Sequence, residues 1–529
     1  MNLKRKDILF GIGTVVFFFL LLEGIARLFY LPGSFDYIER CIIEQGLAEK
    51  KPKDEYRIFL YGESTAHGHV FFPKSTIRLW TKLYLENLLG EETAKNVKLV
   101  NFGRLGADSN FITQSFLDTL VYKPDLVIFY TAHNDFANLD NRRAIFYRMS
   151  VSENIGQFFN HIIKKSSFIR ILRIANIKAK MTRNSKKECK NKKSKFDRWY
   201  VEEKNKIDIN ANLLEPGSKE FNIVKEHWEG NIRRIIKVAQ NHKIPIIFFE
   251  GVARYRDYPP FESKHLYLLN QQDLLKWTDL NNQAEEYFIR GQYQQASELY
   301  KKCLEIDREY AMTYFRLGQC LKKLKDYAEA KKNYLMANDK DYFPIRAPQV
   351  VNQYYDELRR QHLRGVHVIK TQKVFEEKSP NGIIDNSLIL DQIHPTIKGQ
   401  ALMALEVVRL MYEEGYYADK KSWRWDDLKP MEELKEKLNI DQDFQFAVYV
   451  HSARYVGSYF DEAIEYLKKA LEIKPDSIIA RSQLAWTYWK KGDKKEAIDL
   501  YKQLSQEDPQ QASEFFKKYP EIEKEIMKP

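Results

Sequence analysis

The sequence predicts an α/β fold that carries added all-α helical hairpins and an N-terminal transmembrane helix. Short apolar runs alternate with helical patterns, which is typical of βαβ units in a doubly wound parallel sheet. Elsewhere a 34-residue period appears twice, as in tetratricopeptide helical hairpins. An apolar run near the N-terminus is long enough to cross a bilayer.

Composition narrows the class of protein. A chain of 529 residues suggests roughly three to five folding units, and 44% hydrophobic with 30% charged residues excludes global disorder and a polytopic membrane protein. The net charge of +12 gathers in one stretch without a nucleic-acid motif, so we expect no nucleic-acid partner. The four cysteines lack C-x-x-C spacing, so we expect no metal site; a disulfide between Cys303 and Cys320 stays open.

The predicted anchor comprises residues 8–30, which begin with an uncharged run over 8–22. About 20 residues span a bilayer core. Lys4, Arg5 and Lys6 precede the run, which by the positive-inside tendency leaves the N-terminus in the cytoplasm and the remaining chain outside it. A cleaved signal peptide and a buried helix of a soluble protein are the alternatives.

Buried strands are predicted in order along the chain, with the fifth weaker than the others: 56–61, 97–102, 125–131, 244–250 and 366–369. Helical patterns separate them, including 221–241, and another helical run covers 399–413. The carboxyl ends of parallel strands meet at one edge of a sheet, so we expect functional residues there.

The repeats are recognised by small and aromatic residues that return after 34 positions. Ala296 and Tyr300 recur as Ala330 and Tyr334, and Ala463 recurs as Ala497 near the C-terminus. Such hairpins pack through their small residues and leave a concave face, which we expect to bind a protein partner or to shape the substrate groove. With two repeats at each place, each pair should dock on the α/β domain or on the other pair.

Three further parts of the sequence leave alternatives open. Residues 150–180 form an amphipathic helical candidate, which would pack on the core, cover the site or lie on a membrane. Residues 178–198 are strongly basic and are read as a solvated loop, with binding of anionic lipid or polysaccharide as the alternative. Trp423 and Trp425 would pack between domains or stack on a sugar.

The residues that carry chemistry follow successive predicted strands. Ser64 ends the turn after the first strand, Gly106 follows the second, and Asn134 follows the third. Asp391 and His394 share one loop three residues apart. A serine hydroxyl, an imidazole base and a carboxylate that orients the imidazole make up a nucleophilic triad.

These residues in this order resemble the four blocks of the SGNH hydrolases, also called GDSL-type esterases. The resemblance implies a flavodoxin-like sheet, a catalytic triad of Ser64, Asp391 and His394, and no cofactor or metal. It also implies an oxyanion hole formed by Ser64, Gly106 and Asn134. The family's block pattern is altered at two positions, because Glu63 replaces an aspartate and Ala132 replaces a glycine. We read the neighbouring His67, His69 and His133 as ordinary polar residues.

The predicted organisation has eight parts. They are a transmembrane signal anchor (1–32), a first hydrolase part (33–150), an amphipathic and basic insertion (151–218), a second hydrolase part (219–276), an inserted repeat pair (277–344), a last hydrolase part (345–420), a linker (421–443) and C-terminal repeats (444–529).

The expected function is a membrane-anchored, extracytoplasmic serine esterase of the bacterial cell envelope, acting on an acyl ester or an acetylated saccharide. An O-acyltransferase that modifies envelope or extracellular polysaccharide would use the same residues, with a sugar hydroxyl in place of water. A non-catalytic scaffold built on the repeats is the alternative from another class.

Overall fold

A computed structural model describes residues 34–137, 142, 213–456 and 459–507. Its centre is a five-stranded parallel sheet in the order β2-β1-β3-β4-β5, which is the flavodoxin-like order of doubly wound folds. The strands are β1 (Tyr56–Gly62), β2 (Val97–Asn101), β3 (Leu126–Tyr130), β4 (Ile246–Phe249) and β5 (Val366–Ile369). The predicted α/β class and all five predicted strands are confirmed.

One face of the sheet is covered by α2 (Ser34–Glu44), α6 (Ser109–Thr119), α12 (Lys219–Asn241) and α17 (Gln349–Arg360). Alternate strand residues point to opposite faces, and Phe59, Phe129 and Phe248 point to this one, where they pack with Trp228 and Tyr355. Phe129 and Phe248 stack at 5.4 Å between ring centroids. This aromatic layer explains why the strands read as continuous apolar runs.

The opposite face is covered mainly by α4 (Ile77–Leu89) and α19 (Ile397–Glu414), which pack on Ile58, Ile128 and Ile247. Thr76 caps α4 and Thr396 caps α19 through their side-chain oxygens, as expected for helix N-termini. The smaller elements of the domain are α3 (Ser64–His67), α5 (Glu91–Ala94), η1 (Leu120–Tyr122), α7 (Asn134–Ala137), α18 (Thr371–Glu377) and η3 (Pro380–Gly382).

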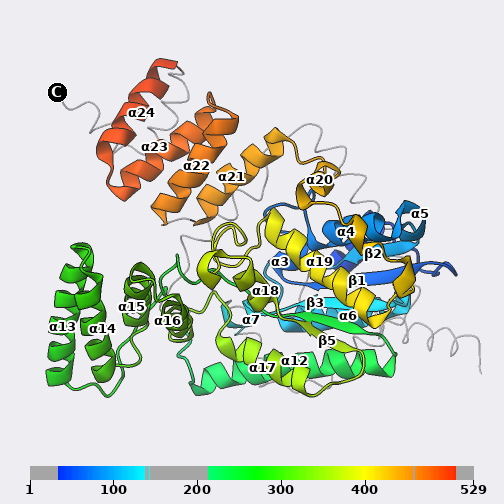
Figure 1. Ribbon diagram of the computed structural model, residues 1–529, viewed down its shortest axis with the longest axis horizontal. Coiled ribbons are helices and arrows are strands. Elements are labelled where there is room, and N and C mark those ends of the chain that lie inside the picture. The colour runs from blue at the N-terminus through cyan, green and yellow to red at the C-terminus, as the bar shows by residue number, and fades with distance from the viewer. Residues whose placement is uncertain (1–33, 138–141, 143–212, 457–458, 508–529) are drawn as a thin grey trace, which may run out of the picture.

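Two helical arms extend from the same side of this domain (Figure 1). The first lies between β4 and α17 and contains α13 (Gln271–Ile289), α14 (Tyr293–Ile306), α15 (Ala311–Lys323) and α16 (Tyr327–Asp339). The second contains α21 (Gln442–Val456), α22 (Phe460–Ile473), α23 (Ile478–Lys491) and α24 (Lys494–Glu507). The predicted small residues Ala296, Ala330 and Ala463 are buried within the hairpins, as the repeat pattern requires.

Boundaries differ from the expected ones in two places. The first arm begins at Gln271, six residues before position 277. Residues 421–443, expected to be a linker, overlap η4 (Lys420–Ser422) and include η5 (Trp425–Asp427) and α20 (Met431–Glu436). Within them Trp423 and Leu434 are buried in the same apolar cluster as α4 and α19, so this segment belongs to the α/β domain.

Several expectations concern residues that lie outside the described part of the chain. The anchor at 8–30, the amphipathic candidate at 150–180 and the basic stretch at 178–198 are among them. Among the described residues, no helix has the length and apolar character needed to cross a membrane. Cys303 and Cys320 are both buried free thiols, so the disulfide left open by the sequence is not formed.

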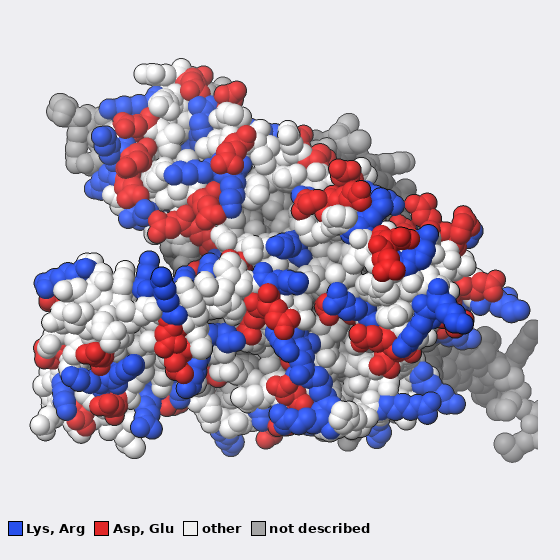
Figure 2. Space-filling view, in the orientation of Figure 1, with Lys and Arg blue, Asp and Glu red and all other residues white. Residues whose placement is uncertain are grey.

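The charges of the described residues are mixed on the face seen in Figure 2. Lysine and arginine side chains are interspersed with aspartate and glutamate over both arms and over the α/β domain. Many of these pairs are exposed ion pairs one helical turn apart, such as Lys469 with Glu465 at 2.6 Å. Pairs of this kind contribute little to stability.

Candidate active site

The site begins where β1 ends. Ser64 is the first residue of the short helix α3, so its hydroxyl lies at the carboxyl end of β1. The neighbouring strands β2 and β3 lie on either side of β1 and lead to Gly106 and Asn134. The structure therefore brings the first three sequence-predicted segments to one edge of the sheet, as the parallel topology requires.

A continuous chain of hydrogen bonds joins Ser64, His394 and Asp391. The Oγ of Ser64 lies 2.7 Å from Nε2 of His394, and Nδ1 of His394 lies 2.7 Å from Oδ2 of Asp391. All three side chains are buried. Because the carboxylate faces Nδ1, that nitrogen carries the proton, and Nε2 is left to accept the serine O–H.

The charge of Asp391 is stabilised within this buried chain. Burial alone would raise its pKa, but His394 beside it and two backbone N–H groups outweigh that effect and lower the pKa to about 2. Those N–H groups belong to Ile393 and His394 and donate to Oδ1 at 2.8 and 2.9 Å. Asp391 is thus ionised at neutral pH.

The two ends of the loop that carries Asp391 and His394 are hydrogen-bonded to each other. The N–H of Leu390 donates to the carbonyl of His394 at 2.8 Å, and an isolated antiparallel bridge pairs Ile389 with Pro395. α19 starts directly after this loop, at the N-cap Thr396. Asp391 and His394 are therefore held between a short hairpin and the start of a buried helix.

Asn134 and Gly106 lie on two connected loops. The Nδ2 of Asn134 donates to the carbonyl of Ala107 at 3.0 Å, so its carboxamide lies beside the residue that follows Gly106. Gly106 has a φ of +68°, a left-handed conformation that favours glycine. Asp135 also connects these two loops, because its carboxylate accepts hydrogen bonds from the backbone N–H and the hydroxyl of Ser109.

Glu63, which the sequence singled out only as a departure from a pattern, has a defined place. Its buried carboxylate accepts the N–H of Ala132 at 2.7 Å and that of His133 at 3.1 Å. The residue before Ser64 is thereby tied to the loop that ends in Asn134. Burial raises the pKa of Glu63 to about 8, against the opposing effect of these N–H donors.

His133, one of the histidines near Ser64, is held by hydrogen bonds through both ring nitrogens. Nδ1 of His133 accepts the N–H of Ala347 at 2.9 Å, so Nε2 donates to the Tyr130 hydroxyl at 2.8 Å. Burial lowers the pKa of His133 to about 3, which keeps this ring neutral. Among the described residues, no group of three or more His, Cys, Asp or Glu side chains is arranged to hold a metal ion.

One histidine near the site, His451, was missed by the sequence reasoning. His69 packs edge-on against His394 at 4.7 Å between ring centroids and against His451 at 5.7 Å. Burial, together with these neighbouring rings, lowers the pKa of His69 to about 2. His451 belongs to α21 of the second arm, and no local pattern connects it to the loop of His394.

The comparisons with known proteins identify the helical arms. Residues 284–325, 312–339 and 460–517 match tetratricopeptide repeat models. One curated relative, the uncharacterized protein ycf37 of Cyanophora paradoxa, is 39% identical over 79 residues, which are 14% of this chain and 45% of the relative. The chain thus spans less than half the length of that relative.

The α/β domain is similar to solved structures at low sequence identity. A GDSL-like lipase from Bacteroides thetaiotaomicron is 10% identical, with 72% of this chain and 99% of that chain covered, at a TM-score of 0.29. A structure described as an acylhydrolase, from Bacteroides fragilis, is also 10% identical. The similarity covers 71% of this chain and 95% of that chain, at a TM-score of 0.30. At such TM-scores the geometry of the site is the ground for assigning a function.

Proposed function

We propose that this chain is a serine esterase that hydrolyses acyl or acetyl esters, with Ser64 as nucleophile. The observation that carries the proposal is the buried chain from Ser64 through His394 to Asp391, in which both hydrogen bonds are 2.7 Å long. This arrangement serves acyl transfer, because the base is in contact with the nucleophile and a carboxylate fixes the tautomer of the base.

In the first half of the reaction, the Oγ of Ser64 attacks the ester carbonyl while its proton passes to Nε2 of His394. Asp391 stabilises the imidazolium that results. The tetrahedral intermediate collapses when His394 gives that proton to the alcohol oxygen, which leaves. The acyl group then remains bonded to Ser64.

In the second half, His394 takes a proton from water as the water oxygen attacks the acyl carbon. Collapse of the second intermediate releases the carboxylic acid and returns the proton to Ser64. In both halves, the backbone N–H groups of Ser64 and Gly106 and the carboxamide of Asn134 would stabilise the oxyanion. Donors of this kind usually supply the largest single contribution to the rate.

Labelling with a fluorophosphonate followed by peptide mapping tests the proposal without knowledge of the natural substrate. We expect the label on the peptide that contains Ser64, and no label on the Ser64→Ala variant. An intact, folded chain that stays unlabelled would contradict the assignment and favour the scaffold alternative. If labelling occurs, release of free acetate, compared with transfer of acetyl to an added saccharide, separates an esterase from an O-acyltransferase.

The location of the chain is a separate proposal. The run at 8–30 and the basic residues before it support an uncleaved anchor with the catalytic domain outside the cytoplasm. A protease added to intact spheroplasts should then digest the catalytic domain, while the undigested protein stays with the membranes. Protection from the protease would contradict this orientation.

A further inference from the structure

The second helical arm is in direct contact with the loop that carries Asp391 and His394. Leu390, the residue before Asp391, is buried in an apolar cluster together with Val448 and Leu467 of this arm. Phe71, seven residues after Ser64, belongs to the same cluster. The arm therefore shares one core with both loops that supply the triad.

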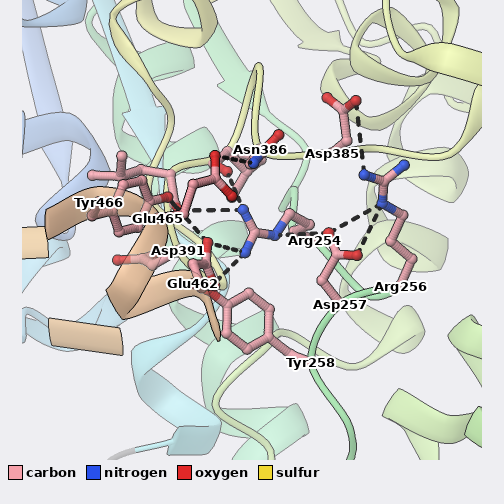
Figure 3. A network of polar contacts seen from close by, with 12 residues as sticks. Arg254, Arg256, Asp257, Tyr258, Asp385, Asn386, Asp391, Glu462, Glu465 and Tyr466 are labelled. Atoms are coloured by element: carbon pink, nitrogen blue, oxygen red, sulfur yellow. Dashed lines mark hydrogen bonds and ion pairs between the residues drawn. The ribbon is translucent and has the colours of Figure 1, made fainter. Parts of the chain in front are cut away.

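Polar contacts converge on the same loop through Arg254, which is 2% exposed. Its Nη1 donates to the carbonyls of Ile389 at 3.1 Å and Leu390 at 3.3 Å. Its Nη2 donates to a carboxylate oxygen of Glu462, which lies on α22 of the second arm (Figure 3). One guanidinium thus connects α22 to the two residues that precede Asp391.

Tyr466 makes a second connection from the same helix. Its hydroxyl donates to the carbonyl of Leu390 and lies 3.0 Å from Oε1 of Glu462. Tyr258 completes the network, with its hydroxyl 2.8 Å from Nη2 of Arg254 and in contact with Oε2 of Glu462. Figure 3 shows this group of side chains next to Asp391.

We propose that Glu462 and Tyr466 are positioning residues for the Asp391–His394 loop, and that the C-terminal repeat pair is therefore a working part of the catalytic unit. Glu462 acts by orienting Arg254, and Tyr466 acts on the Leu390 carbonyl directly. A misplacement of about 1 Å at a reacting group is enough to cost ~10²-fold in rate. The proposal rests on the proposed esterase function, because it assigns to these residues an effect on turnover.

The first test compares Glu462→Gln and Tyr466→Phe with wild type and with Glu472→Gln, a matched change at an exposed position of the same helix. For hydrolysis of an aryl acetate by the full chain, we expect kcat to fall at least about tenfold in Glu462→Gln and about threefold in Tyr466→Phe. KM should stay within about twofold, since the substrate is not touched. Glu472→Gln should behave as wild type.

A double variant separates positioning from stability. In Arg254→Met with Glu462→Leu both charges of the buried pair are removed, and apolar replacement of a buried ion pair is often neutral for stability. Asp257, which also pairs with Arg254, keeps Arg256 as its partner at 3.1 Å. The carbonyl of Ile389 nevertheless loses its donor, and the carbonyl of Leu390 keeps only the Tyr466 hydroxyl. We expect unfolding near the wild-type temperature with kcat still at least tenfold low. Recovery of kcat together with stability would overturn the positioning role.

Hydrogen exchange provides a readout that does not depend on activity. The amides of residues 388–394 should exchange faster in Glu462→Gln and Tyr466→Phe than in wild type or Glu472→Gln. If the wild type fails to label or turn over while this exchange rises, the esterase assignment fails and the positioning contact stands. Unchanged exchange and unchanged kcat in both variants would overturn the inference.

Discussion

The carboxylate of Glu63 accepts a hydrogen bond of 2.7 Å from the backbone N–H of Ala132. These are the two positions at which the sequence departs from the block pattern that it otherwise resembles. The contact ties the turn before Ser64 to the loop that leads to Asn134. The two departures therefore lie in one local structure.

Gly251 makes room for the methyl group of Ala132. A Cβ built on Gly251 would lie 2.7 Å from the Cβ of Ala132, closer than two carbon atoms normally approach. The backbone of Gly251 is in turn held by Asn352, whose side chain makes hydrogen bonds of 2.9 Å to both its N–H and its carbonyl. The alanine is accommodated by a glycine in the loop that follows β4.

Replacement of Ser64 by alanine should abolish hydrolysis of short aryl esters. Loss of a triad nucleophile commonly costs ~10⁶-fold in kcat, so we expect activity at the background of the assay. The change removes one oxygen atom from the end of a helix, so thermal unfolding should stay nearly unchanged. Turnover at the wild-type rate in this variant would rule out Ser64 as the nucleophile.

Asn134→Ala should lower kcat by about 10²- to 10³-fold, the usual effect of removing one oxyanion donor. Because Asn134 also donates to the Ala107 carbonyl, some loss of stability is expected alongside. Fluorophosphonate labelling of Ser64 should slow in parallel with kcat. A variant whose kcat is unchanged while its stability falls would assign Asn134 a purely structural role.

Replacement by alanine should affect folding at Gly103 and catalysis at Gly106. A Cβ at Gly103 would lie 2.4 Å from the backbone nitrogen of His67, so Gly103→Ala must displace α3 and should fold poorly. At Gly106 a Cβ meets nothing within 4 Å, and the cost is about 1 to 2 kcal/mol of left-handed strain. Gly106→Ala should fold, with kcat reduced more than stability. Thermal unfolding followed by circular dichroism measures the stability of each variant, and aryl acetate kinetics measure its kcat.

Glu63 should make stability fall as pH rises. Its pKa is about 8 in the folded chain and about 4.5 when unfolded, so between these values the folded state binds more protons. Its contribution to stability is then complete below pH 4.5 and is lost as pH rises through 8, by up to roughly 1.4 kcal/mol per pH unit. Glu63→Gln lacks this titration.

Urea unfolding at pH 5.5 and pH 8.5 measures the effect. The free energy of unfolding of Glu63→Gln relative to wild type should rise between the two pH values. Glu92→Gln, at an exposed position of α5, should show no such change. An equal difference at both pH values would mean that the carboxyl group is already ionised in the folded chain at pH 5.5.

The inserted repeats should matter for large partners and not for small esters. Lys301 and Lys302 are exposed on α14, so Lys301→Glu with Lys302→Glu should leave aryl acetate turnover within about twofold. If the first arm helps to bind substrate, deacetylation of an acetylated polysaccharide should weaken by more than that. Equal loss of both activities in a folded variant would place α14 in the catalytic site itself.

The sequence alone determined the strands, the repeats and the order of the site residues. Each of these leaves a local signal. A buried parallel strand such as β3 is a continuous apolar run, a helical hairpin repeats its small residues every 34 positions, and Ser64, Gly106 and Asn134 each follow a strand. Parallel topology then predicts that these residues meet, without any knowledge of how the domains pack.

Only the tertiary structure decided how the second arm meets the catalytic loop. Arg254 and Glu462 are 208 positions apart, and neither their spacing nor any periodicity connects them. The expectation that each repeat pair docks somewhere followed from its small size, whereas the docking face depends on the shape and polarity of two assembled surfaces. Leu390, Phe71 and the Arg254 guanidinium form such a surface only after the sheet has brought distant loops together.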